Sequence, residues 1–387
     1  MNPHLKNIIE GLIVQDEKGA YSLHTLQERM EYFHTTAFSL ACLKDGRIDF
    51  VYSTGTKEHD GTERVDDHTP FMAASISKAV FAVGVMKLVQ QGVLDLDRDV
   101  NGYLKGYQVA ADPGLSNRVT LRMILGHLAG LNVDGFGGYE VGQPTPTVMQ
   151  VLNGEAPAKT PMLRVVRPQN TFVPKTAENP TGPYSGGGFV LAMKVVCDVL
   201  GRDDFAAILD ELVLVPFGMK HSTFRQSNEP GFHAVYDQRP PTGYNATRDG
   251  RRLDTYVPIP GGHHVYTELA AGGLWSTAED LALFGARLME ILREDNDPSL
   301  RRDTLRQMLV QQPGSENGIG FYIYPTDDPD VSMFAHTGCN DGFLSMAYYF
   351  TNGYGLTMTL NSNEGLDFYY TVGRTVAHEY GLPISKV

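Results

Sequence analysis

The sequence predicts a mixed α/β fold of the α+β kind, in which helices flank one antiparallel sheet and a second lobe is mostly helical. Two strand-like segments lie near the N-terminus, and three more, followed by a helix, lie near the C-terminus. Two strands alone cannot bury an apolar face, so the early pair is expected to join the later three in one sheet. The helical middle is then an insertion. We expect residues 1–80 and 240–387 to form the sheet domain and residues 81–239 to form a helical, loop-rich lobe.

The strands are predicted from short apolar runs that are rich in β-forming residues and are bounded by turn residues. Residues 37–54 predict two strands joined at Asp45-Gly46, a dipeptide that accepts the positive φ angles of a tight hairpin turn. Three further strands are predicted over residues 330–338, 342–350 and 354–363. A closing helix over residues 363–380 is expected to help cover the sheet.

Helical periodicity fills the chain between these strands. One helix is predicted to end at Gly92, and a second to begin with Thr120 as its N-cap and end near Gly130. Ser276 and Glu279 have the spacing of a capping box that starts another helix. The first two helices correspond to residues 77–91 and 119–131, and two more are predicted over residues 187–201 and 202–219, the last broken by Pro216.

Charge and composition limit the classes of partner and the cell compartment that we expect for this protein. The chain carries 32 Lys and Arg residues against 45 Asp and Glu residues, a net charge of −13, which argues against a broad nucleic-acid or anionic-membrane surface. Glu10 interrupts the only apolar run at the N-terminus, and no apolar stretch is long enough to span a bilayer. Three widely separated cysteines fit a reducing compartment better than a disulfide framework. We therefore expect a cytoplasmic protein, with its oligomeric state left open.

The stretch FMAASISKAVFAVGVM places Ser75 three residues before Lys78 at the start of an apolar helix. Residues i and i+3 of a helix share a face, so the lysine amine can meet the serine hydroxyl. Burial and the positive end of the helix dipole both favour the neutral amine, which can take the serine proton and activate a nucleophile. The alternative is that Ser75 caps the helix and Lys78 lies in solvent.

Two further motifs weigh against that alternative. In TGPYSGGGF, Tyr184 lies where a loop meets a helix, and from there its side chain can point into a cleft. In FAHTGCNDGF, a strand ends in His336-Thr337-Gly338 and a turn follows. Because Gly338 has no side chain, the backbone there can approach a ligand closely. A tyrosine packed under the long loop and an ordinary strand-end turn are the alternatives for these two motifs.

Three motifs, in this order, resemble those of the serine β-lactamase and penicillin-binding-protein family. They are Ser75-x-x-Lys78, Tyr184-Ser185 and His336-Thr337-Gly338. Their spacing is most similar to class C β-lactamases and their esterase, D-aminopeptidase and acyltransferase relatives. Five blocks carry the resemblance through much of the chain: FMAASISK, VTLRMILGHLAGL, PYSGGGF, AAGGLWSTAEDLALF and HTGCNDGF. The resemblance implies the β-lactamase/transpeptidase-like fold and a serine hydrolase that needs neither a cofactor nor a metal ion.

The resemblance also implies a role for each matching residue. Ser75 would attack a carbonyl carbon and become acylated, and Lys78 would take or hold the serine proton. Tyr184 would relay a proton to the leaving group and later activate water. The backbone N–H groups of Ser75 and Cys339 would form the oxyanion hole. The substrate-binding strand edge would comprise His336, Thr337, Gly338 and Cys339.

Two positions depart from the β-lactamase pattern. Gly186 replaces the asparagine of Tyr-x-Asn, a donor for a substrate amide, and His336 replaces a lysine that would anchor a substrate carboxylate more strongly. Both changes favour small esters first, then D-amino-acid amides or peptides. We expect residues 139–181 to shape acyl or leaving-group specificity. The alternatives are β-lactam or D-Ala-D-Ala hydrolysis, acyl transfer, and a slowly deacylating penicillin-binding or sensor protein.

Two rival sites are less favoured. Cys339 and His336 are three apart on a strand end, where their side chains diverge, so they make a poor Cys-His nucleophile. A metal site built from His263, His264 and Glu268 is disfavoured because adjacent residues of an extended segment point to opposite sides. We expect three residues to line or support the pocket instead: His263, His264 and Tyr266.

Overall fold

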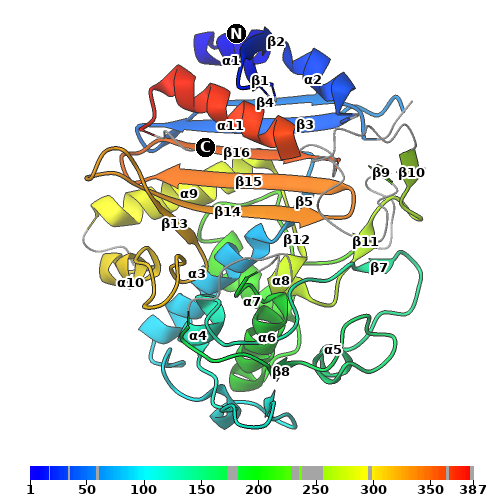
Figure 1. Cartoon of the computed structure of the whole chain (residues 1–387), viewed down its shortest axis with the longest axis vertical. Helices are drawn as coiled ribbons and strands as arrows, with labels where there is room; N and C mark the ends of the chain where they lie inside the picture. The colour runs from blue at the N-terminus through cyan, green and yellow to red at the C-terminus, as the bar shows by residue number, and fades with distance from the viewer. Residues whose placement is uncertain are drawn as a thin grey trace.

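The computed structural model shows a six-stranded antiparallel sheet with helices against both faces and a mostly helical half beyond one of them (Figure 1). The strand order is β13-β14-β15-β16-β3-β4. These strands span, in that order, Tyr322–Pro325, Ser332–Asn340, Phe343–Phe350, Gly355–Leu360, Ala37–Lys44 and Arg47–Gly55. The structure describes residues 1–16, 18–33, 35–57, 61–171, 182–227, 235–237, 256–294, 299–362 and 366–383.

The sheet joins the two ends of the chain, and this prediction is confirmed. β16 pairs with β3, so that Thr357 lies opposite Ala41 and the early hairpin continues the late strands. Asp45 and Gly46 take φ angles of 56° and 75° at the tight turn between β3 and β4. β13 adds a short edge strand that the sequence pattern does not predict.

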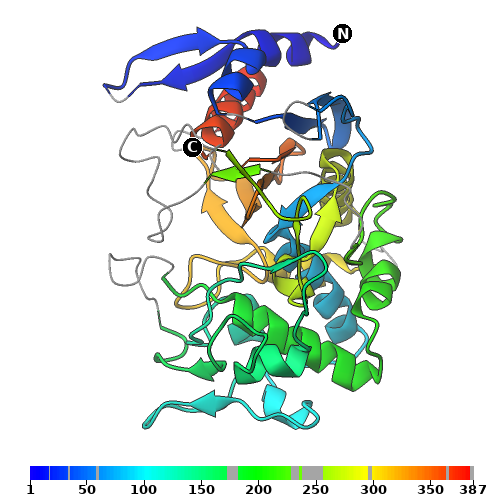
Figure 2. The same cartoon turned by 90° about the vertical axis from the view of Figure 1, so that its right-hand side faces the viewer.

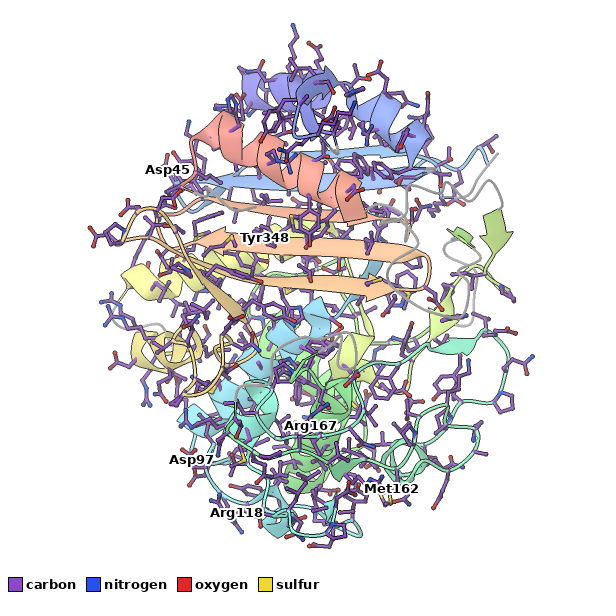
Figure 3. The ribbon with its side chains drawn as sticks, viewed as in Figure 1. Asp45, Asp97, Arg118, Met162, Arg167 and Tyr348 are labelled. Atoms are coloured by element: carbon purple, nitrogen blue, oxygen red, sulfur yellow. The ribbon has the colours of Figure 1, made fainter. Side chains whose placement is uncertain are left out.

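One face of the sheet packs against the helices of the two termini (Figure 1). Phe38 and Met346 of the sheet share an apolar cluster with Phe368 of the C-terminal helix. Tyr348 points from β15 toward that helix (Figure 3), and its hydroxyl lies 3.4 Å from the hydroxyl of Tyr369. The helices of this face are α1 (Pro3–Glu10), α2 (Leu26–Tyr32) and α11 (Leu366–Tyr380). The hairpin of β1 (Leu12–Gln15) and β2 (Tyr21–His24) lies at this outer end (Figure 2).

The other face packs against α9 and the helical half. One continuous apolar cluster runs from Ala41 and Ala347 of the sheet to Leu191 in the helical half, so the two parts share a core. Asp97 and Arg118 lie far from the sheet in the helical half (Figure 3).

None of the helices that the structure describes combines the length and apolar content needed to cross a bilayer. The bounds of the two predicted domains stay a prediction, and residue 240 lies outside the described residues.

The remaining elements belong mostly to this half and its border with the sheet. The helices are α3 (Ile76–Gln90), η1 (Val100–Gly102), α4 (Leu121–Leu125), α5 (Val148–Asn153), α6 (Gly186–Leu200), α7 (Phe205–Leu209), the π-helical η2 (Asp210–Leu214), α8 (Leu269–Gly272), α9 (Ala278–Arg293) and α10 (Arg302–Met308). The short strands are β5 (Phe71–Ala74), β6 (Ala110–Ala111), β7 (Tyr139–Glu140), β8 (Arg164–Val165), β9 (Val235–Asp237), β10 (Tyr256–Pro258), β11 (His264–Val265) and β12 (Leu274–Ser276).

The predicted capping box of Ser276 and Glu279 is wrong. Ser276 is the last residue of β12, where it pairs with Phe71 of β5. Its backbone is therefore committed to a strand, and the helix α9 begins at Ala278. Thr277 is the N-cap, and its side chain accepts a hydrogen bond from the Asp280 N–H at 3.0 Å.

Two other helix predictions need correction. The helix that begins after the Thr120 cap ends at Leu125, well before Gly130, because His127 takes a φ angle of 58° and turns the chain away. Residues 202–219 do not form one α-helix before Pro216. They form α7 followed by the π-helical η2.

Gly338 of β14 allows another strand to approach the sheet edge. A Cβ at Gly338 would lie 2.3 Å from the Ala73 carbonyl oxygen and 2.3 Å from the Ser345 Oγ. The Ser345 hydroxyl donates to the same Ala73 carbonyl at 2.7 Å. The backbone of β5 therefore takes the space that a side chain at position 338 would need, and the predicted approach of a ligand to this strand edge stays a prediction. The contact of β5 with Gly338 places the residue that follows β5, Ser75, beside the edge of the sheet.

The packing of α9 on the sheet yields a stability test. A Cβ at Gly285 would lie 2.0 Å from the Tyr349 ring, whose hydroxyl donates to the Leu281 carbonyl at 2.6 Å. Although alanine favours a helix over glycine, we expect Gly285→Ala to lower the free energy of unfolding by about 1–3 kcal/mol through overpacking. Urea denaturation measures this. Gly135→Ala, whose added Cβ has no atom within 4 Å, is the matched control, and equal effects of the two would contradict the packing.

Candidate active site

Ser75 lies at the junction of β5 and α3. It occupies the N-cap position of α3, but its side chain makes no capping hydrogen bond. Ala74 before it takes a φ angle of 47°, which is uncommon outside glycine. The Ser77 hydroxyl fixes this turn, because it donates to the Ala74 carbonyl and accepts from the Leu274 N–H at 2.9 Å. The geometry leaves the Ser75 Oγ available for other groups.

Lys78 lies inside the protein, so the alternative of a solvent-exposed lysine is wrong. Its residue is 2% exposed, and its Nζ lies 3.0 Å from the Ser75 Oγ. The Nζ also donates to the Ala271 carbonyl in α8. Burial lowers the pKa of the Lys78 amine to about 7. A large share of the amine is therefore neutral near pH 7, with its lone pair free to accept a proton.

Tyr184 approaches the same oxygen from the start of α6. Its hydroxyl donates to the Ser75 Oγ at 2.9 Å. Its ring centroid lies 4.9 Å from the Lys78 Nζ. Ser185 is the N-cap of α6, and its Oγ accepts from the Gly188 N–H and donates to the Val133 carbonyl. The structure thus brings together the hydroxyl, the amine and the phenol that the sequence singled out.

The strand edge predicted to bind substrate carries an uncharged histidine. His336 is 3% exposed, and its Nδ1 lies 2.7 Å from the Thr337 carbonyl oxygen. Burial, assisted by the nearby Lys78 charge, lowers the pKa of the His336 imidazole to about 3. A neutral imidazole with one nitrogen already bound to the backbone is a poor anchor for a carboxylate. β13 pairs with Ser332–Ala335 of β14 and does not extend along residues 336–340.

The side chains of β14 alternate between the two faces of the sheet. Phe334 belongs to the cluster on the helical side, whereas Ala335 and Cys339 pack with the cluster under α11. His336 and Cys339 therefore point to opposite faces, and the structure contradicts a Cys-His nucleophile. The predicted contribution of the Cys339 backbone N–H to an oxyanion hole does not depend on its side chain and stays a prediction.

The glycine that replaces asparagine in the tyrosine motif is required by packing. A Cβ at Gly186 would lie 2.8 Å from the Asp134 carbonyl oxygen and 3.2 Å from the Phe136 ring. The Gly186 N–H donates to the same carbonyl at 2.7 Å. The loop that contains Asp134 and Phe136 thus occupies the space into which a longer side chain at position 186 would extend.

The residues of the rival metal site have separate partners. His263 Nε2 lies 3.0 Å from a backbone carbonyl oxygen, and His264 Nδ1 lies 3.6 Å from Asp341 Oδ2. Glu268 Oε1 accepts a hydrogen bond from the Tyr139 hydroxyl at 2.9 Å. Among the described residues, no group of three or more His, Cys, Asp or Glu side chains is arranged to hold a metal ion. The expectation that His263, His264 and Tyr266 line the pocket stays a prediction.

Comparison with known proteins gives this site its context. A family model described as Beta-lactamase matches residues 24–378. The chain belongs to the Beta-lactamase family. As a member of this family, it is a serine hydrolase. Among curated proteins, it is 24% identical over 349 residues to Esterase EstB from Burkholderia gladioli, a match that covers 84% of this chain and 85% of that protein.

Solved structures share the Beta-lactamase family fold. The octameric penicillin-binding protein homologue from Pyrococcus abyssi matches with a TM-score of 0.69 and 20% identity, over 92% of this chain and 76% of that one. D-amino acid amidase from Ochrobactrum anthropi SV3, complexed with L-phenylalanine amide, matches with a TM-score of 0.67 and 19% identity, over 92% and 96%. At these identities the two structures support the fold.

Two groups that contact Lys78 and Tyr184 in this Beta-lactamase family member were not singled out from the sequence. The Ala271 carbonyl accepts a hydrogen bond from Lys78. The sequence could not reveal this contact, because every residue has a backbone carbonyl. His127 stacks on Tyr184, with ring centroids 4.4 Å apart. His127 lies in the block VTLRMILGHLAGL, but no periodicity distinguishes a single buried histidine from a packing residue.

The burial of Lys78 predicts a pH-dependent stability. Its pKa is about 7 in the folded protein, against a reference of 10.5. Between these values the unfolded chain binds more protons, so the free energy of unfolding gains a term that rises with pH. We expect the stability of the wild type relative to Lys78→Met to increase from pH 7 to pH 9.5 and to stay level below pH 7, by chemical denaturation at each pH. A difference that is constant from pH 6 to 9.5 would contradict a buried, deprotonating amine.

Proposed function

We propose that this protein is an esterase-like serine hydrolase that forms an acyl-enzyme on Ser75 from small esters. One observation carries the proposal: the Lys78 Nζ and the Tyr184 hydroxyl both lie within 3.0 Å of the Ser75 Oγ. The amine is buried among apolar neighbours and has a pKa of about 7, so it is poised to act as a base near neutral pH.

Acylation begins with a proton transfer from Ser75. The neutral Lys78 amine takes the hydroxyl proton while Oγ bonds to the substrate carbonyl carbon. The carbonyl electron pair moves to oxygen, and the N–H groups of Ser75 and Cys339 stabilise the resulting anion. Ser75 precedes the first turn of α3, where backbone N–H groups lack helical acceptors. When the carbon–alkoxy bond breaks, the proton passes through the Tyr184 hydroxyl to the leaving alcohol.

Deacylation reverses these roles with water as the nucleophile. Tyr184 orients the water and relays a proton from the water to Lys78, while the water oxygen bonds to the acyl carbon. The bond between that carbon and the Ser75 Oγ then breaks, and Lys78 returns the proton to the Oγ. Acyl transfer would follow the same path with an alcohol or amine in place of water. These steps use only groups of the chain and the substrate.

The surroundings of the site favour neutral acyl groups. The uncharged His336 offers no cation for a substrate carboxylate, and the space beyond Gly186 is filled by the loop that carries Asp134. The relative Esterase EstB, similar over most of its length, bears an esterase name. We therefore place small esters first and D-amino-acid amides second. We propose a small-molecule substrate, without nucleic-acid or membrane partners, and a cytoplasmic location.

A substrate panel tests this ranking. The protein is incubated with p-nitrophenyl esters of short acids, D-amino-acid p-nitroanilides and a chromogenic cephalosporin, and kcat/KM is measured for each. We expect the esters to give the highest value and repeated turnover. A preference for the cephalosporin would overturn the substrate class, and release of a single equivalent of chromophore with every compound would identify an acylated, slowly turning-over protein instead.

Substitutions of the reacting groups test the assignment of roles. Ser75→Ala should abolish ester turnover and acylation detected by intact mass, while the circular dichroism spectrum stays unchanged. Tyr184→Phe should lower kcat by about a hundredfold or more because the proton relay is lost. Ser116→Ala, an exposed serine in the helical half, is the matched control and should keep wild-type kinetics. Turnover by Ser75→Ala at the wild-type rate would refute the mechanism.

A further inference from the structure

We propose that His127 is a positioning residue that holds the Tyr184 phenol at the Ser75 hydroxyl. The inference rests on the role of Tyr184 in the proposed reaction and assigns a new role to a residue outside the reacting triad. It is carried by three features of His127: its backbone conformation, its two contacts with the segment that bears Tyr184, and the electrostatic surroundings of its ring.

The backbone of His127 occupies a position that normally belongs to glycine. α4 ends at Leu125, and the Leu128 N–H bonds to the Met123 carbonyl while the His127 N–H bonds to the Ile124 carbonyl. This pair of bonds is the Schellman motif, with His127 as the residue just beyond the cap. Its φ angle is 58°, a left-handed conformation that costs about 1–2 kcal/mol for a residue with a Cβ. Glycine would end this helix without that cost, so a constraint on the side chain accounts for the histidine.

The His127 side chain makes two contacts with consecutive residues of the tyrosine motif. Its ring stacks on the Tyr184 ring, with centroids 4.4 Å apart and planes inclined by 29°. Its Nδ1 accepts a hydrogen bond from the Ser185 N–H at 3.1 Å. The stacking limits movement of the phenol along one direction, and the hydrogen bond fixes the backbone that carries it. Together they hold the Tyr184 hydroxyl 2.9 Å from the Ser75 Oγ.

The ring of His127 must remain neutral to make this hydrogen bond. An imidazolium would carry a proton on Nδ1, and that nitrogen could no longer accept from the Ser185 N–H. His127 is 5% exposed, and the groups that face it are Lys78 of α3, His336 of β14 and the Tyr184 phenol. Burial, with Lys78 and His336 nearby, holds the pKa of the His127 imidazole well below its usual range. The acceptor is therefore preserved wherever Lys78 works as a base.

Misplacement of a catalytic group by about 1 Å lowers the rate by up to about a hundredfold. Asparagine tolerates the left-handed conformation and keeps an acceptor but has no ring. We expect His127→Asn to lower kcat for a p-nitrophenyl ester about ten- to a hundredfold, with KM within about twofold of the wild type. His127→Gly, which relieves the backbone conformation, should show a similar loss. His378→Phe, at an exposed position on α11, is the control and should match the wild type.

A double-mutant cycle separates positioning from a general loss of structure. If His127 acts through the Tyr184 hydroxyl, His127→Asn should cost less than about twofold in kcat in the Tyr184→Phe background. An equal loss in both backgrounds, or wild-type kcat in both His127 variants, would overturn the inference. Ser75→Ala is assayed in parallel, because activity in that variant would instead overturn the proposed function. If Ser75→Ala is inactive while both His127 variants match the wild type, the positioning role of His127 is refuted and the proposed function stands.

Discussion

The burial of one lysine amine beside a serine hydroxyl is the constraint on which the rest of the site depends. α3 is apolar around its whole circumference, with residues 76–88 buried, so a lysine within it cannot reach solvent. A buried amine must either find partners or give up its charge. Lys78 does both, through the Ala271 carbonyl and a pKa of about 7. The α8 turn is therefore part of the site, although none of its side chains reacts.

Close approaches of backbone, more than side-chain contacts, bring the remaining groups to this amine. The absence of a Cβ at Gly338 lets β5 pass against β14, and the positive φ of Ala74 then directs the chain into α3. Gly186 accommodates the Asp134 carbonyl at the start of α6, just after Tyr184. A Cβ at either position would lie within 3 Å of a backbone carbonyl oxygen, so a substitution would force the neighbouring backbone to shift. A reaction that requires atoms within 3 Å of each other depends on these contacts as much as on the reacting residues.

The sequence predicts the sheet and the grouping of Ser75, Lys78 and Tyr184 well because their signals are local or carried by recurrent motifs. Lys78 is followed by the unbroken apolar run AVFAVGVM, and FMAA precedes its motif, so its burial can be predicted from the sequence. The three late strands and the Asp45-Gly46 hairpin are bounded by turn residues. Each such feature is decided by fewer than about ten consecutive residues, a length over which side-chain pattern and turn chemistry determine the conformation.

What the sequence does not predict depends on contacts between distant segments. Ser276 and Thr277 are both good cap residues, and pairing with Phe71, far earlier in the chain, decides between them. β13 can be identified as a strand only from its pairing with β14. His127 belongs to no recognisable sequence pattern, because the role proposed for it depends on the Tyr184 ring against which it stacks. The space at Gly338 is likewise filled by β5, a segment that no local pattern places there.

The most direct test of the account is the pH dependence of the acylation step, measured as the single-turnover rate constant with an excess of enzyme over an aryl ester. If neutral Lys78 takes the Ser75 proton, the rate constant should be low at acidic pH, rise as the amine loses its proton, and level off above a pKa of about 7. A rate constant that stays the same from about pH 5.5 to 8.5 would show that no group with such a pKa activates the serine, and would contradict the central claim.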